Sequence, residues 1–296
     1  MKNIILGTDW WTDCDDAVAL RMLCRAVNRG EIRLLGIAIN ACMEHSVASV
    51  DGFLTLEGIR DIPLGIDLAA TDFGGRPPYQ ARLAPYATRY KTNADAEDIV
   101  RLYRRLLASA TEPVEIVEIG YLQGFTAFMR SAGDDISPKS GLELLSEKVS
   151  KMWVMAGKWD ADGERENNFA RNERSRIAGE EFCRLCSVPV TFLGWEVGYD
   201  VISGSRLDER DHLHLALCDH GSGSGRSSWD PMTVHMALIG DEKAAGYRTI
   251  RGKATVDAVS GQNYFAHAAD GQHAYVIKVQ NNEFYRDAID EMIKSN

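Results

Sequence analysis

The chain lacks a hydrophobic stretch of the length that a membrane span requires. A transmembrane helix takes about 20 consecutive apolar residues, and no run of that kind occurs in the 296 residues. The apolar run within the opening MKNIILGTD is also too short for the core of a signal peptide. We therefore expect a cytoplasmic protein with no membrane partner.

Positive charge is also in short supply. Lysine and arginine together number 33 against 43 aspartates and glutamates, which gives a net charge of −10. A surface with this balance repels a phosphate backbone, so we expect no nucleic-acid partner. Free nucleosides carry no phosphate charge and remain possible ligands, and part of the acidic excess can serve to bind cations.

Cysteine and histidine patterns give no sign of a zinc site or of a disulfide framework. The six cysteines are scattered, mostly within apolar stretches, as buried thiols of a reducing compartment are. Cys183 and Cys186 form one C-x-x-C without a second pair, so we interpret them as two thiols on one helix. None of the seven histidines shows H-x-x-x-H spacing.

What the sequence does contain is a regular alternation of apolar, β-rich runs with helical patterns, and no internal repeat. The runs that we predict as buried strands are 4–7, 34–40, 63–67, 114–120, 152–157 and 190–194. The segments with helical spacing are 17–28, 47–59, 96–110, 125–131 and 177–185. This pattern predicts a single α/β domain over residues 1–296, with a mostly parallel sheet covered by helices on both faces.

The other segments are less regular. Residues 247–279 are typical of added strands, and 281–293 of a closing helix. Two segments, 68–93 and 220–228, show no regular pattern and are rich in glycine with proline or serine. Long loops in a compact domain are often lids or binding loops.

An aspartate cluster follows the first predicted strand. Asp9, Asp13, Asp15 and Asp16 lie within the segment GTDWWTDCDD, where α/β sheets place ligands beyond the carboxyl ends of their strands. Two unit charges 4 Å apart repel by about 4 kcal/mol at an effective dielectric constant near 20, so something must compensate. Carboxylate, carbonyl and water ligands suit a hard divalent cation, calcium or magnesium, rather than zinc.

Helix capping is the alternative interpretation of this cluster. Asp13, Asp15 and Asp16 near a helix N-terminus would favour its dipole. Capping accounts for one or two of these residues, but not for Asp9 at the edge of the strand.

The same segment resembles the N-terminal signature of the inosine–uridine preferring nucleoside hydrolase family, D-x-D-x-G-x-D-x-D-D-A in its longer form. Residues 35–40 resemble the second strand of that family, which ends in a polar residue at the site. ENNFA at 166–170 resembles its E-x-N-F segment, and SWDP at 228–231 resembles its late aspartate followed by proline. The four elements occur in the family's order over nearly the whole chain. The resemblance implies a Rossmann-like nucleoside hydrolase fold.

The resemblance also implies a calcium site. Asp9 would bind Ca²⁺ and accept a proton from the attacking water, while Asp16 and Asp230 would be further ligands. A backbone carbonyl, which the alignment of motifs places at Ile119, would complete the set. Asp15 would hold a ribose hydroxyl.

The remaining substrate contacts come from outlying positions. By the resemblance, Asn40, Glu166 and Asn168 would hydrogen-bond the ribose, the last two near its 5′ end. From their own segments alone, Glu166 and Asn168 are equally explained as loop residues and Asn40 as a turn residue. Asp230 could simply cap a helix over 232–239.

Tryptophans stand at two positions of the motifs. Trp229 occupies the place of a histidine in many relatives, and Trp10 and Trp11 lie in the aspartate segment. We expect these indoles to line the base end of the site, where stacking on an aromatic face contributes about 1–3 kcal/mol per base. The alternative is that they are buried packing residues, as tryptophans usually are.

The function that follows is a calcium-dependent N-ribosyl hydrolase, which cleaves the N-glycosidic bond of a ribonucleoside or related N-riboside to free base and ribose. Glycosidic cleavage passes through an oxocarbenium-like state, so a pocket rich in carboxylates suits it. A small-molecule nucleoside or riboside would be the partner, and we expect a homo-oligomer.

Departures from the family pattern leave two alternatives to weigh. Gly7 replaces the first aspartate of the signature, and Gln123-Gly124 replaces T-N in the loop after the fourth predicted strand. These changes keep open a non-catalytic or divergent binder of sugars or nucleosides on the same scaffold. An aspartate-dependent phosphotransferase is disfavoured because Trp11 stands where its second carboxylate would be. The group that activates the leaving base, and whether Asp13 touches the metal or supports the loop, stay open.

Overall fold

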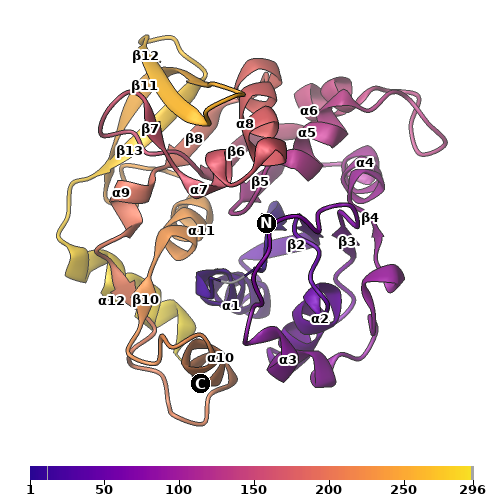
Figure 1. Cartoon of the computed structure of the whole chain (residues 1–296), viewed down its shortest axis with the longest axis vertical. Helices are drawn as coiled ribbons and strands as arrows, with labels where there is room; N and C mark the ends of the chain where they lie inside the picture. The colour runs from indigo at the N-terminus through magenta and orange to yellow at the C-terminus, as the bar shows by residue number, and fades with distance from the viewer. Residues whose placement is uncertain (12, 295–296) are drawn as a thin grey trace.

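A large twisted sheet runs through the molecule, shown in a computed structural model that describes residues 1–11 and 13–294 (Figure 1). Thr12, which belongs to the aspartate segment, lies outside the described residues. The strands follow one another in space as β4 (Glu97–Asp98), β3 (Leu64–Ile66), β2 (Ile32–Ile39), β1 (Lys2–Thr8), β5 (Val114–Glu118), β6 (Val149–Met155), β8 (Val190–Leu193), β13 (His273–Lys278), β11 (Tyr247–Val256), β12 (Gln262–His267) and β7 (Glu164–Arg165). Neighbours from β4 to β13 are all parallel. The pairs from β13 to β7 are antiparallel.

Helices cover both faces of the sheet, as a parallel sheet of apolar strands requires. One face carries α1 (Asp15–Asn28), α2 (Ser46–Leu56), α11 (Trp229–Ile239) and α12 (Asn282–Ile293). The other carries α4 (Ile99–Ser109), α5 (Gln123–Arg130), α6 (Gly141–Lys148) and α8 (Glu173–Leu185). Along β1, Ile4 and Leu6 enter the first core and Ile5 enters the second. The predicted α/β architecture is therefore confirmed.

Several boundaries differ from the sequence prediction. The helix predicted over 96–110 begins only at Ile99, because Glu97 and Asp98 pair with β3 as an edge strand and the Asp98 side chain caps α4. The loop 68–93 contains the short helices α3 (Gln80–Leu83), η1 (Ala84–Tyr86) and the start of η2 (Asn93–Asp95). The helix predicted over 232–239 begins earlier, at Trp229.

Short elements without a sequence signal complete the fold. They are α7 (Asn167–Ala170), α9 (Trp195–Gly198), α10 (His212–Asp219), and a two-stranded antiparallel ribbon of β9 (Ile202–Ser203) and β10 (Arg226–Ser227). The ribbon ends the loop 220–228 directly before α11.

The C-terminal part is integral to the sheet. The strands predicted over 247–279 and the closing helix predicted over 281–293 are present as β11, β12, β13 and α12. β13 lies between β8 and β11, and α12 packs against α1 at the opposite end of the chain. The last helix of the chain thus lies next to the first one.

The cysteines are all free thiols, four of them buried, Cys42 half-buried and Cys218 exposed. Cys183 lies in α8 and Cys186 directly follows it. No helix in the described part of the chain has the length and hydrophobicity needed to cross a bilayer.

Candidate active site

Three aspartates from the two ends of the chain meet beyond the carboxyl end of β1. Asp15 and Asp16 begin α1, Asp230 lies in the first turn of α11, and these two helices pack against each other. Each of the three offers a carboxylate oxygen within 4.8 Å of the others, and all three side chains are buried. The motifs at opposite ends of the chain therefore form one carboxylate cluster.

Helix capping does not explain this cluster. Cys14 occupies the N-cap of α1 and Ser228 that of α11, and neither helix has a side-chain cap. The hydrogen bonds to the cluster come instead from neutral groups around it. The Thr8 hydroxyl and the Trp10 N–H, at 3.2 Å, donate to Asp16 Oδ1, and the Asp230 N–H donates to Asp15 Oδ2 at 3.1 Å.

Negative charge at the cluster is not balanced by protein cations. Burial raises the pKa of Asp15, Asp16 and Asp230 well above the usual range, and their mutual repulsion adds to this effect. Among the described residues, no lysine or arginine forms an ion pair with any of the three. Arg226 is near enough to lower the pKa of Asp15 in part. Buried oxygen ligands with surplus negative charge fit a hard divalent cation, so the cluster can hold a metal ion.

Asp9 adjoins the cluster without belonging to its tightest group. It follows β1, and its Oδ1 accepts the Trp11 N–H at 3.1 Å. Burial, together with the charges of Asp13, Asp15 and Glu166, raises the pKa of Asp9 to about 8 against the effect of the Trp11 bond. Gly120 makes this position possible, because a Cβ there would lie 2.3 Å from the Asp9 nitrogen.

A cavity of about 280 Å³ opens above the carboxylates. Asp9, Asp13, Asp15, Asp16 and Asp230 line it together with Ile119, Met155, Trp11, Glu166, Asn167, Asn168, Trp195, Arg226 and Trp229. The volume lies near the lower end of small-molecule sites. With the exceptions of Asn40 and Trp10, every residue that the sequence analysis assigns to the site lines this cavity.

Glu166 and Asn168 form one wall of the cavity, and hydrogen bonds to the backbone hold both side chains in place. Glu166 Oε1 accepts the Asn168 N–H at 2.8 Å, and Oε2 accepts the Gly157 N–H at 2.9 Å. Burial raises the pKa of Glu166 to about 7 despite these bonds. Asn168 Nδ2 donates to the Met155 carbonyl at 2.9 Å. Asn167, which the sequence analysis did not single out, lies beside them in the cavity wall.

Asn40 lies behind the cavity. Its Oδ1 accepts the Tyr121 N–H at 2.9 Å, and its backbone carbonyl accepts the side-chain amide of Gln123. Gln123, one of the departures from the family pattern, thus joins the ends of β2 and β5. In this structure Asn40 supports the loop that carries Ile119 and Gly120.

The two tryptophans of the aspartate segment point in different directions. Trp10 has a left-handed backbone with φ of 46°, a conformation uncommon outside glycine. Its indole is fully buried in the core and donates to Ser49 Oγ at 2.8 Å, so the expectation that Trp10 lines the base end is wrong. Trp11 does line the cavity, and it ties down the loop 68–93 by donating to the Gly74 carbonyl at 2.6 Å.

A pair of indoles forms the opposite wall. Trp229 Nε1 donates to the Trp195 carbonyl at 2.7 Å, and both rings line the cavity. Trp195 also stacks on Tyr199 with a centroid distance of 4.4 Å. Gly198 permits this packing, since a Cβ there would lie 2.6 Å from Trp229 Cδ1. Trp195 had no sequence signal, because α9 has only four residues.

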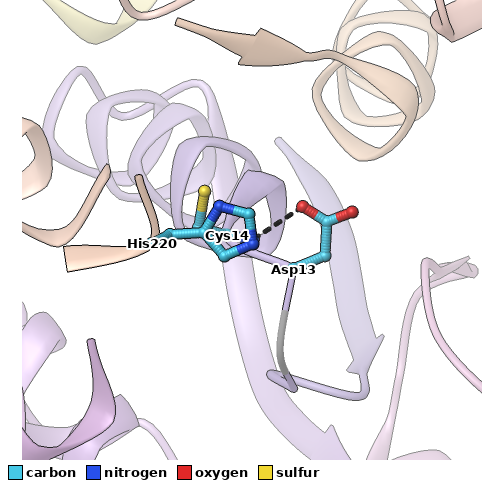
Figure 2. A group of neighbouring side chains, drawn as sticks. All are labelled: Asp13, Cys14 and His220. Atoms are coloured by element: carbon cyan, nitrogen blue, oxygen red, sulfur yellow. Dashed lines mark hydrogen bonds between the residues drawn. The ribbon is translucent and has the colours of Figure 1, made fainter. Parts of the chain in front are cut away.

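Asp13 holds Arg226, which comes from β10. Arg226 Nε donates to Asp13 Oδ1 at 2.7 Å and Nη2 donates to Oδ2 at 2.5 Å. Figure 2 shows Asp13 with Cys14 and His220, whose possible ligand atoms also lie within 4.8 Å of one another. A cation there would face the Arg226 guanidinium, and burial raises the pKa of the Cys14 thiol, so this group is a poor metal site. Asp13 therefore supports the loop and Arg226.

Gly7, which replaces the first aspartate of the signature, lies against Glu118. A Cβ on Gly7 would be 1.9 Å from Glu118 Oε2. Glu118 is fully buried, accepts a hydrogen bond from the Tyr103 hydroxyl, and has its pKa raised to about 8 by burial. The carboxyl of Glu118 thus fills space that a side chain at position 7 would need.

Comparisons with known proteins identify the architecture. No family model matches the chain, and no curated protein matches it in sequence. An inosine-uridine preferring nucleoside hydrolase from Bacillus anthracis superposes with a TM-score of 0.69 at 14% identity, over 99% of this chain and 99% of that one. The plant nucleoside hydrolase PpNRh1 gives 0.70 at 14% identity, over 100% and 99% of the two chains. The type III effector protein XopQ, complexed with adenosine diphosphate ribose, gives 0.68 at 16% identity, over 99% and 92%. Over its whole length, the chain therefore has the nucleoside hydrolase fold.

Proposed function

We propose that the protein is a calcium-dependent hydrolase that cleaves the bond between ribose and base in a ribonucleoside or related N-riboside. The observation that carries this proposal is the meeting of Asp15, Asp16 and Asp230 beside Asp9, on the floor of a cavity with indole walls. Such a floor suits a sugar that develops positive charge, and indole walls suit a planar base.

The metal ligands in this proposal are Asp9, Asp16, Asp230 and the Ile119 carbonyl. Asp15 lies close enough to Asp16 and Asp230 to contact the same ion. When bound, a divalent cation would hold ribose hydroxyls and lower the pKa of the attacking water. The surplus of buried negative charge supports a cation of this kind, and the all-oxygen donor set supports calcium.

Asp9 is the proposed base. Its Oδ1 is held by the Trp11 N–H, which orients the carboxylate. A carboxylate oriented in this way can take a proton from the attacking water, and such a base contributes about 10²–10⁴ in rate. Glu166 and Asn168 would hold the sugar from the side. Asn40 would position the loop after β5 through its Oδ1, and its Nδ2, which has no partner among the described residues, would donate to the ribose.

Trp229 and Trp195 would contact the base of the substrate. Both line the cavity, and the hydrogen bond between them fixes the Trp229 ring. The proposal also includes a homo-oligomeric protein. Its cytoplasmic location is supported by the six free thiols, and the lack of a nucleic-acid partner by the net charge of −10.

A reducing-sugar assay over a panel of nucleosides tests the proposal. With calcium we expect release of ribose from at least one ribonucleoside, and chelation should abolish it. The matched 2′-deoxynucleoside should react about 10- to 100-fold more slowly, because it lacks a hydroxyl for Asp15 and the metal. Asp9→Asn should be inactive, whereas Asp135→Asn, which removes an exposed carboxylate, should be unaffected. Equal rates for ribose and deoxyribose would contradict the sugar contacts.

A binder without turnover is the second candidate. The structural similarity to an effector complexed with adenosine diphosphate ribose favours it, as do the changes at Gly7 and Gln123. Calorimetric titration with adenosine diphosphate ribose and with nucleosides distinguishes the two. Saturable binding with no base released from any compound of the panel would support the binder and refute the hydrolase.

A further inference from the structure

The cavity contains one positive charge in a strongly negative setting. Among its lining residues in the described part of the chain, Arg226 alone has a cationic side chain. The Arg226 side chain is 31% exposed, so protein covers most of it and the remainder is open to a ligand. The guanidinium lies 5.3 Å from the centroid of the Trp229 ring. The guanidinium thus covers part of that ring face, and a base that enters the cavity beside Trp229 would meet Arg226 at its edge.

The guanidinium is held in place and still has donors to spare. Two of its N–H groups donate to the two oxygens of Asp13, and a guanidinium has five. Asp13 is itself fixed, because its Oδ1 accepts the Cys14 N–H at 2.8 Å and its backbone carbonyl accepts the Tyr79 hydroxyl at 3.0 Å. His220 faces the same carboxylate (Figure 2). Among the described residues, the other three N–H donors of Arg226 have no hydrogen-bond partner and are left for a ligand.

Departure of a nucleobase requires help of the kind that such donors give. When the C1′–N bond breaks, its electron pair remains on the base nitrogen, and an unassisted base is a poor leaving group. Position 229 is occupied by Trp229, and none of the described lining residues is a histidine that could protonate the base. Arginine keeps its proton at any physiological pH, so its contribution is charge and hydrogen bonds rather than proton transfer.

We propose that Arg226 is a catalytic residue that stabilises the departing base, and that Asp13 is the residue that positions it; this inference rests on the proposed hydrolase function. In the step, the water oxygen bonds to C1′ and the water proton passes to Asp9. The electron pair of the C1′–N bond passes to the base, which accepts hydrogen bonds from Arg226. The base takes a proton from solvent after it leaves, and Asp9 returns its proton to solvent. The acceptor atom would lie on the edge of the base that faces the guanidinium, as N7 of a purine can.

Leaving-group dependence tests this role. Arg226→Gln should lower kcat for a purine ribonucleoside by about 10- to 100-fold, the effect of losing a hydrogen bond to a charged group. For p-nitrophenyl β-D-riboside, whose phenolate departs without assistance, the loss should be about tenfold smaller. Arg226→Lys should recover only part of the loss, because an ammonium does not reproduce the planar fork. Asp13→Asn should show the same preference for the aryl riboside to a smaller extent.

The controls separate this role from a structural one. Arg101→Gln removes an equivalent two-bond pair, with Asp135, on the exposed surface and should leave both substrates unaffected. Calcium affinity in Arg226→Gln should stay the same or increase, because a positive charge near the carboxylates is lost. Equal losses on both substrates, or a weakened calcium affinity, would overturn the inference and show that Arg226 only supports the loop.

A binding measurement decides the inference if the wild-type protein cleaves neither compound, in which case the proposed function itself has failed. The probe is a purine base that ionises near neutrality, titrated at pH values below and above its own pKa. The wild-type protein should bind the anionic form more tightly, and Arg226→Gln should lose that preference. An unchanged preference for the anion in Arg226→Gln would overturn the assignment of Arg226 to the base.

Discussion

Asp230→Asn should stabilise the metal-free protein and at the same time weaken its binding of calcium. The carboxylate oxygens of Asp15, Asp16 and Asp230 lie within 4.8 Å of one another. At that distance two unit charges repel by about 3–4 kcal/mol at an effective dielectric constant of 20. Burial and mutual repulsion raise the pKa of all three groups, which reduces their ionisation and hence the repulsion, so we expect a gain of about 1–2 kcal/mol in unfolding free energy.

Urea unfolding in EDTA and over a series of calcium concentrations measures both effects. Calcium should stabilise the wild-type protein by an amount that grows with the logarithm of its concentration above Kd. The same increase should require much more calcium in Asp230→Asn, because one charged ligand is lost. Asp135→Asn is the control, since it removes an exposed aspartate far from the cluster. A variant that is less stable in EDTA, with an unaltered calcium response, would refute the assignment of Asp230 to a metal site.

Three further predictions concern single side chains. Gly7→Ala should lower the unfolding free energy by about 1–3 kcal/mol, because its Cβ would lie 1.9 Å from Glu118 Oε2. The cost should be smaller in a Glu118→Ala background, and strict additivity in urea unfolding would contradict the contact. Folding raises the pKa of Glu118 from 4.5 to about 8, so the folded state keeps a proton that the unfolded chain releases. Wild-type stability should therefore fall between pH 5 and 8 by up to about 1.4 kcal/mol per unit from this group. Glu118→Gln should flatten the slope, and an identical slope in both proteins would disprove the cause. Trp229→Phe should retain calcium affinity and lose part of the fluorescence change on titration with a base. An unaltered fluorescence response with a large loss of stability would show that Trp229 serves packing alone.

The sequence was sufficient to predict the parallel sheet, because its strands are continuous apolar runs. Residues 4–7, 114–120 and 190–194 were predicted from that property, and each contains most of β1, β5 or β8. The aspartate segment was equally accessible, since four acidic residues next to a strand end are a local feature. The assignment of Asp230 to the metal site depended on the family resemblance, because the local sequence around it is explained equally well by the start of a helix.

The contacts that complete the site could not be read from local pattern. Arg226 lies in a two-residue strand, which is too short to show periodicity, and its partner Asp13 is 213 residues away. The resemblance placed Asn40 at the ribose, but the sequence did not show that its Oδ1 accepts the Tyr121 N–H or that its carbonyl accepts the Gln123 amide. Trp10 and Trp11 are identical in type, and only the left-handed turn at Trp10 sends one to the core and the other to the cavity.

The order in which the carboxylates occur along the chain has a consequence for biosynthesis. Asp15 and Asp230 are 215 residues apart, so a growing polypeptide presents the first part of the cluster long before the ribosome reaches α11. A truncated product that ends before α11 has an incomplete cluster. A bound ion would link α1 to α11 and close a loop of most of the polypeptide, which lowers the entropy of any partly opened state. Only the complete chain would therefore bind the metal tightly. The bound ion would also slow unfolding, because α1 and α11 could not separate without releasing it.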